Sequence, residues 1–128
     1  MKTMKRKILF VDDDANLSQL LSKGLAAYGY ETRMENDSTR ALEAARAFKP
    51  DLIVLDVDMP GMDGGDVAHQ LSEQKDTCSL PILFLTSLMV KDDAVRFEKT
   101  GETILSKPIR IVDLAQHIEK RLAATGRT

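Results

Sequence analysis

Short apolar runs and longer stripes of apolar residues alternate along the whole chain. The runs have the length and composition of buried strands, except that the second is more polar and suits a sheet edge. They lie at 7–11, 30–35, 52–56, 82–86 and 103–106. Between and after them, apolar residues recur at helical spacing, at 16–28, 41–48, 65–74, 92–99 and 111–122. The pattern therefore predicts five strand and helix pairs.

This alternation predicts an α/β fold. Parallel strands need long crossovers, and right-handed crossovers place helices over both faces of the sheet. Five units with a polar second strand favour a doubly wound five-stranded parallel sheet of order 2-1-3-4-5, with five helices distributed over both faces. At 128 residues the chain has the size of one domain, so we expect a single domain over 1–128 with a core at about 6–124.

Composition and charge narrow the functional classes. The chain has 43% hydrophobic and 30% charged residues, and its net charge of -2 gives no general attraction to nucleic acid or anionic membranes. Cys78 is the only cysteine, which excludes an intrachain disulfide. The apolar stretch at 8–11 is too short for a signal peptide or a membrane span. We therefore expect a cytoplasmic protein without direct nucleic-acid or membrane contacts.

Polar residues gather at the ends of the predicted strands. In a doubly wound sheet, ligands bind beyond the carboxyl ends of the strands, where the strand order reverses. The residues that end or follow these strands are Asp12, Asp13, Asp14, Asp56, Val57, Asp58, Thr86, Ser87 and Lys107. The expected crevice thus combines carboxylates, a hydroxyl and one ammonium group.

This set of groups points to metal-assisted phosphoryl chemistry. Neighbouring carboxylates raise one another's pKa values and cost stability unless a cation joins them, and oxygen-only ligation favours a hard ion, Mg2+ or Mn2+. Thr86 and Lys107 suit the oxygens of a phosphoryl group, which the metal would draw to a carboxylate nucleophile. Aspartates also serve as helix N-caps and turn formers, but their coincidence with a hydroxyl and a lysine at other strand ends favours a site. We therefore predict phosphorylation of an aspartate.

Four segments carry a resemblance to a known family. They are ILFVDDD, DLIVLDVDMPGMDG, LFLTS and LSKP, and they occur in that order. The chain resembles a response regulator receiver domain of two-component signalling, with a CheY-like (flavodoxin-like) fold. The resemblance implies a phosphoacceptor switch that takes a phosphoryl group from the phosphohistidine of a sensor histidine kinase or a phosphotransfer protein. It also implies self-catalysed phosphorylation and autodephosphorylation rather than an enzyme with an external substrate.

Matched residue by residue, the resemblance implies roles for the acids. Asp56 would be the phosphoacceptor and Asp13 a direct Mg2+ ligand, while Asp12 would support the metal mostly through water. The main-chain carbonyl of Asp58 would be the other protein ligand. Asp14 has no equivalent role.

The remaining matched positions concern the switch. The resemblance makes Thr86 the switch hydroxyl and Lys107 the phosphoryl-binding lysine, which a cis bond to Pro108 would aim into the site. Ile104 stands where the family usually has an aromatic residue, and an aliphatic side chain does not report activation in the same way. The segment before Ile104 is also one residue shorter than the common form, and Ser87 replaces a small Ala.

The resemblance also bears on phosphoryl lifetime and output. In the family, the residues two positions after the phosphoacceptor and two after the switch hydroxyl flank the path of the attacking water, and here they are Asp58 and Leu88. Asp58 would orient water and Leu88 would exclude it, so we expect an intermediate lifetime. The family usually signals through the face formed by 92–99, 103–106 and 111–122, where we expect a downstream protein or domain to bind.

A phosphatase is the alternative interpretation. Asp56, Val57 and Asp58 resemble the DxD nucleophile and acid pair of haloacid-dehalogenase-type phosphatases, with Asp58 as general acid. In that family the DxD usually follows the first strand and the paired acids come late, whereas the order here is reversed and no sequence is left for a substrate cap. A degenerate receiver that only binds partners is a third interpretation, against which the complete set of matched site residues argues.

Overall fold

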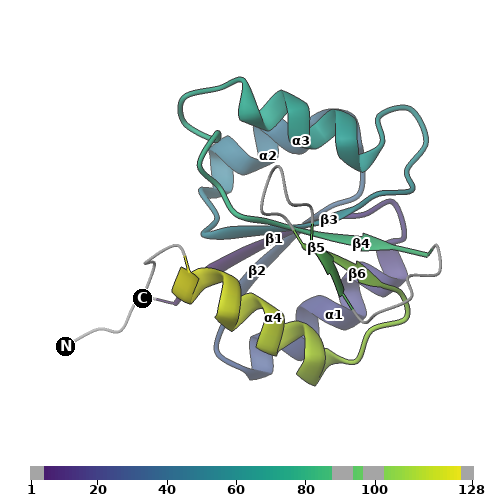
Figure 1. Cartoon of the computed structure of the whole chain (residues 1–128), viewed down its shortest axis with the longest axis vertical. Coiled ribbons are helices and arrows are strands. Elements are labelled where there is room, and N and C mark those ends of the chain that lie inside the picture. The colour runs from purple at the N-terminus through teal and green to yellow at the C-terminus, as the bar shows by residue number, and fades with distance from the viewer. Residues whose placement is uncertain (1–4, 88–93, 97–102, 125–128) are drawn as a thin grey trace.

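One sheet of six strands forms the centre of the described structure. The structure is a computed structural model and describes residues 5–87, 94–96 and 103–124 (Figure 1). The strands are β1 (Lys7–Val11), β2 (Glu31–Glu35), β3 (Leu52–Asp56), β4 (Ile82–Thr86), β5 (Ala94–Arg96) and β6 (Thr103–Ser106). Their order is β2-β1-β3-β4-β6-β5, and every neighbouring pair from β2 to β6 is parallel. The fifth predicted strand, at 103–106, is β6 in the structure. The predicted doubly wound parallel sheet of order 2-1-3-4-5 is therefore confirmed, and β5 is an additional strand at its edge.

Helices cover both faces of this sheet. In the described part of the chain they are α1 (Ala15–Ala27), the 3-10 turn η1 (Ser38–Arg40), α2 (Ala41–Phe48), α3 (Gly64–Ser72) and α4 (Ile111–Ala124). Helices α1 and α4 lie on one face, and α2 and α3 lie on the other (Figure 1). Asp14 and Asp63 begin α1 and α3, because each side chain accepts a hydrogen bond from a backbone N–H of the first turn. None of these described helices is long and apolar enough to cross a membrane.

The sheet separates two apolar clusters. Alternate residues of a strand point to opposite faces, so Ile8 and Phe10 pack toward α1 and α4, while Leu9 and Val11 pack toward α2 and α3. Strand β3 is buried along its full length, Leu52–Asp56, as its unbroken apolar sequence predicts. The ends of β1 and β3 are thus held by packing from both sides.

The prediction of a helix at 92–99 is wrong over the part that the structure describes. Residues 94–96 form β5, which pairs antiparallel with β6, and the rest of that segment lies outside the described residues. The outer edge of β6 carries backbone N–H and C=O groups that need partners, and β5 supplies them. A short stretch with a single apolar stripe does not encode this pairing, because the pairing depends on the exposed edge of another strand.

Gly64 allows α3 to begin in direct contact with the end of β3. A Cβ at this position would lie 2.6 Å from the carbonyl oxygen of Asp56 and 2.8 Å from Cα of Val57. These are backbone atoms, so a larger residue would displace the segment that carries Asp56. The contact therefore couples the start of α3 to the position of the site.

We expect Gly64→Ala to lower the free energy of unfolding by about 1–3 kcal/mol, because backbone atoms cannot move aside as a side chain does. Gly65→Ala is the matched control, since its Cβ would approach a side-chain oxygen of Asp63 at 3.3 Å. That variant should change stability by less than about 0.5 kcal/mol. Urea denaturation measures both, and equal effects in the two variants would contradict the close contact.

Candidate functional site

Three carboxylates meet at the carboxyl ends of β1 and β3. Asp12 follows β1 and Asp56 ends β3, and these neighbouring strands pair Val11 with Leu55. One carboxylate oxygen from each of Asp12, Asp13 and Asp56 lies within 4.8 Å of the other two. Asp12 and Asp56 are only 3% and 2% exposed, whereas Asp13 is exposed. The structure thus brings together the three side chains predicted to serve a metal.

The ammonium group of Lys107 reaches this cluster from the end of β6. Its Nζ lies 3.0 Å from Asp12 Oδ2 and 3.1 Å from Asp56 Oδ1, so one cation bridges both buried carboxylates. The backbone N–H of Lys107 donates to the carbonyl of Thr86 at 2.7 Å, which ties this residue to the end of β4. The peptide bond between Lys107 and Pro108 is cis, the form that the family resemblance raised for this position.

The crowding of charges changes the acidity of Asp56. Its pKa is raised to about 6, first because the carboxyl is buried and second because Asp12 carries a like charge beside it. Contacts with Lys107 and with the backbone N–H of Asp58 oppose this shift only in part. Burial lowers the pKa of Lys107, but the hydrogen bonds and charges of Asp12 and Asp56 outweigh it and hold that pKa above its usual range. One ammonium group therefore leaves the cluster able to accept a further cation.

The side chain of Asp58 contacts the end of β4. Its Oδ2 accepts hydrogen bonds from Thr86 Oγ1 at 3.0 Å, from Ser87 N at 3.2 Å and from Ser87 Oγ at 3.1 Å. These bonds, the one from the Ser87 backbone first, hold the pKa of Asp58 below its usual range. The backbone N–H of Asp58 donates to Asp56 Oδ1 at 3.2 Å. Residue 58 therefore connects the acidic cluster to the predicted switch hydroxyl.

The contact of Asp58 with Thr86 and Ser87 was not predicted from the sequence. The signal that could have found it is the strand register, in which Asp56 pairs with Leu85. Two residues further along each segment, just beyond the ends of β3 and β4, Asp58 and Ser87 then stand opposite each other at the carboxyl ends of the strands.

A comparison with known families assigns the chain to a class of proteins. A family model described as response regulator receiver domain matches residues 8–119. The chain belongs to this family. The receiver domain is similar in structure to the chemotaxis protein CheY4 of Vibrio cholerae, with a TM-score of 0.80 and 28% identity over 93% of this chain and 100% of that chain. A signal receiver domain of a signal transduction histidine kinase from Syntrophus aciditrophicus gives a TM-score of 0.78 and 28% identity over 96% and 94%.

Curated relatives of the receiver domain are longer proteins. The DNA-binding response regulator MtrA of Mycobacterium tuberculosis is 37% identical over 123 residues, which are 95% of this chain and 53% of MtrA. The DNA-binding dual master transcriptional regulator RpaA of Synechocystis sp. is 31% identical over 122 residues, or 94% of this chain and 51% of RpaA. The receiver domain thus spans about half the length of these relatives. The matches do not support the haloacid-dehalogenase-type phosphatase.

Other residues singled out from the sequence lie around the cluster. Ile104 pairs with Phe84 across β6 and β4 and is half-buried against the apolar cluster under α2 and α3. The side chain of Asp14 accepts a hydrogen bond from the backbone N–H of Leu17 at 3.0 Å, so Asp14 acts as the N-cap of α1. Leu88 lies outside the described residues, and its effect on phosphoryl lifetime stays a prediction.

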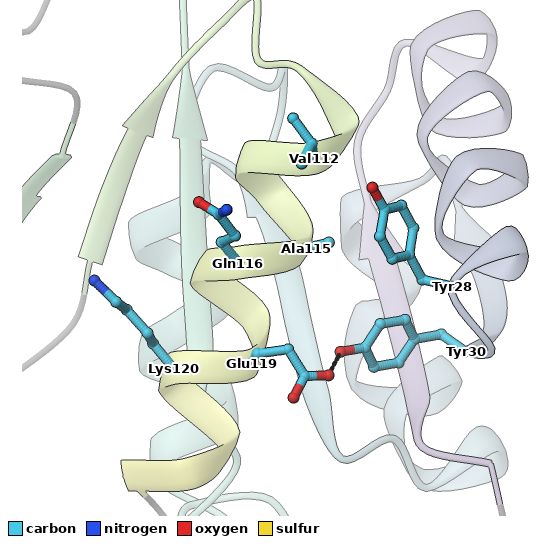
Figure 2. A pocket seen from close by; sticks show the side chains of 7 residues that line it. All are labelled: Tyr28, Tyr30, Val112, Ala115, Gln116, Glu119 and Lys120. Atoms are coloured by element: carbon cyan, nitrogen blue, oxygen red, sulfur yellow. Dashed lines mark hydrogen bonds between the residues drawn. The ribbon is translucent and has the colours of Figure 1, made fainter.

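A separate hollow of about 370 Å³ lies between the end of α1 and the side of α4 (Figure 2). It is lined by Tyr28, Tyr30, Val112, Ala115, Gln116, Glu119 and Lys120. Across it the hydroxyl of Tyr30 donates to the carboxylate of Glu119, and burial together with Glu119 raises the pKa of Tyr30 (Figure 2). Tyr30 directly precedes β2, whereas the acidic cluster follows the strands. The contact between Tyr30 and Glu119 is therefore at the opposite end of the sheet from the site.

Asp56→Asn should stabilise the receiver domain in a pH-dependent way. The folded pKa of Asp56, about 6, lies above the value of about 4 expected in an unfolded chain, so ionising this carboxyl opposes folding at neutral pH. Asparagine mimics the protonated form, and at about pH 7.5 we expect a gain of up to about 2 kcal/mol after allowance for solvent screening. The gain should disappear as pH falls from about 6 to about 4, because the wild-type carboxyl then becomes protonated in both states.

Urea denaturation at several pH values, without divalent cations, measures this gain. A difference between the variant and the wild type that stays constant with pH would contradict the raised pKa of Asp56.

Proposed function

We propose that the receiver domain is a phosphoacceptor switch in which Asp56 takes a phosphoryl group from the phosphohistidine of a sensor histidine kinase or a phosphotransfer protein. The observation that carries this proposal is the meeting of Asp56 with Asp12, Asp13 and Lys107 at one edge of the sheet. In the transfer, a P–O bond to a carboxylate oxygen of Asp56 forms while the P–N bond breaks, and the imidazole nitrogen keeps the electron pair. Water later cleaves the acyl phosphate, which releases inorganic phosphate and restores the carboxylate.

The donor set of the acidic cluster fits a hard divalent cation. Asp12, Asp13 and Asp56 offer carboxylate oxygens within 4.8 Å of one another, which is the ligand type that Mg2+ and Mn2+ prefer. We propose that Asp13 and Asp56 bind the ion directly, that Asp12 acts mostly through water, and that the main-chain carbonyl of Asp58 is the further ligand. When bound, such an ion supplies positive charge to the oxygens of the phosphoryl group.

Lys107 and Thr86 are the proposed phosphoryl-binding residues. Lys107 Nζ already lies 3.1 Å from Asp56 Oδ1, so the ammonium group contacts the carboxylate that would react. Its positive charge would stabilise the negative charge that is spread over the phosphoryl oxygens in the transition state. Thr86 would donate its hydroxyl proton to one of these oxygens. The protein promotes its own phosphorylation and dephosphorylation in this scheme and turns over no external substrate.

The proposed output is a change in the binding of a downstream protein or domain. The surface expected for this purpose comprises β6, α4 and the segment at 92–99. Within that segment, only residues 94–96 are described. MtrA is described as DNA-binding, but this chain matches about half of it, and we propose no direct nucleic-acid or membrane contact for the receiver domain itself. A cytoplasmic location, where a kinase phosphohistidine is accessible, completes the proposal.

Asp13→Asn should weaken Mg2+ binding by roughly tenfold or more, because it removes an anionic ligand from the cluster. Asp14→Asn is the matched control: it removes the same charge one residue away, and asparagine is an equally good N-cap for α1. Its Mg2+ affinity should change little. Calorimetric titration with MgCl2 measures both, and equal losses in the two variants would show that general charge, and not ligation, governs the binding.

Asp56→Asn should abolish Mg2+-dependent labelling by acetyl phosphate, since the amide lacks the nucleophilic carboxylate oxygen. Intact-mass spectrometry should show one added phosphoryl group on the wild type and none on the variant, and a chelator should prevent the labelling. Asp76→Asn is the control, because Asp76 pairs with Arg46 on the surface away from the cluster. Stoichiometric labelling of the Asp56→Asn variant would overturn the assignment.

A further inference from the structure

Three hydrogen bonds converge on one oxygen of Asp58. The donors to Oδ2 are the hydroxyl of Thr86, the backbone N–H of Ser87 and the hydroxyl of Ser87, at 3.0, 3.2 and 3.1 Å. Asp58 is exposed, so this oxygen has water available and still takes its partners from β4 and the residue that follows it. We call this arrangement of Asp58, Thr86 and Ser87 the Asp58 contact.

The direction of these bonds limits what Thr86 can do. An ionised carboxylate only accepts hydrogen bonds, and a threonine hydroxyl has one proton to donate. While Thr86 donates to Asp58, that proton is not available to another acceptor. A phosphoryl oxygen on Asp56 must therefore displace Asp58 as the acceptor of the Thr86 hydroxyl.

We propose that Asp58 is a positioning residue that competes with the phosphoryl group for the hydroxyl proton of Thr86, and that Ser87 holds the Asp58 carboxylate in place for this competition. The inference rests on the proposed function, because it concerns the response of Thr86 to a group on Asp56. It assigns to the Asp58 side chain a role in the resting state, separate from the main-chain carbonyl proposed as a metal ligand.

The backbone on both sides keeps the competing groups close together. The N–H of Asp58 donates to Asp56 Oδ1 at 3.2 Å, so residue 58 stays near the phosphoacceptor. On the other strand, Ser87 contributes a backbone donor that cannot rotate away, and its hydroxyl adds a second. Ser87 acts on Thr86 only through the Asp58 carboxylate, so its effect should depend on the presence of that carboxylate.

The test uses beryllium fluoride with Mg2+, which forms a phosphoryl-like adduct on an aspartate without being consumed. Removing the competing acceptor by Asp58→Ala should tighten binding roughly fivefold, the equivalent of one net hydrogen bond. Ser87→Ala loosens the carboxylate and should tighten binding roughly twofold. The double variant should match Asp58→Ala alone, because Ser87 has nothing left to hold.

Asp58→Asn separates hydrogen bonding from charge. The amide oxygen still accepts from Thr86 and Ser87, but neutral bonds have roughly half the strength of charge-assisted ones. Binding by this variant should therefore lie between the wild type and Asp58→Ala. If Asp58→Asn and Asp58→Ala bind equally well, loss of negative charge explains the gain and the proposal is overturned. Unchanged or weaker binding by Asp58→Ala, or additive effects in the double variant, overturns it as well.

Two further measurements keep the outcomes distinct. Binding by the wild type that is lost in Asp56→Asn supports the proposed function, and absence of binding by the wild type overturns both that function and the competition. In the protein without beryllium fluoride, the amide proton of Ser87 should shift upfield and exchange faster in Asp58→Ala than in the wild type, as its acceptor is gone. An unchanged Ser87 amide would show that the Asp58 contact does not form in solution, which overturns the proposal whatever the binding data are.

Discussion

The repulsion among three carboxylates at the end of a buried sheet is the constraint on which this site depends. Two unit charges about 4 Å apart near a protein surface interact by about 4 kcal/mol, and here two of the three acids, Asp12 and Asp56, are almost wholly buried. Lys107 bridges these two, but one positive charge does not balance three negative ones. The remaining imbalance favours a bound proton or a bound cation, and it explains the raised pKa of Asp56.

The sheet prevents the acids from moving apart to relieve this repulsion. Strands β1 and β3 are neighbours in a fixed register, and apolar clusters pack on both of their faces. The close approach of Gly64 to the backbone at Asp56 blocks movement on a further side. Because such a core is packed like a solid, the site keeps its geometry in the absence of a ligand. The same rigidity confines any response to the residues beyond the strand ends.

The sequence predicted this site because its positions follow from rules of chain topology. The carboxyl ends of parallel strands lie on the same side of a sheet. Predicting the strands therefore also predicted that Asp12, Asp56, Thr86 and Lys107 lie together. The helix predicted at 92–99 was wrong over 94–96, because pairing along the edge of β6 outweighed a weak local pattern. Similarly, the bond network of Asp58 arises from register between strands and from side-chain rotamers, neither of which local periodicity encodes. Sequence patterns thus located the groups but not their present partners.

Those partners bear on how a phosphoryl group would act. Lys107 is already bonded to Asp12 and Asp56, and Thr86 already donates to Asp58, so both groups that would receive the phosphoryl oxygens have anionic partners. Phosphorylation would therefore exchange one set of charge-assisted bonds for another instead of adding bonds to unpaired groups. The free energy that drives this exchange is the difference between the strengths of the two sets of bonds, which are similar. Only such a difference in interaction free energy between two conformations shifts the equilibrium between them. The loss of a single hydrogen bond near the strand ends, such as that from the Ser87 hydroxyl to Asp58, would then be enough to alter the balance between the two states.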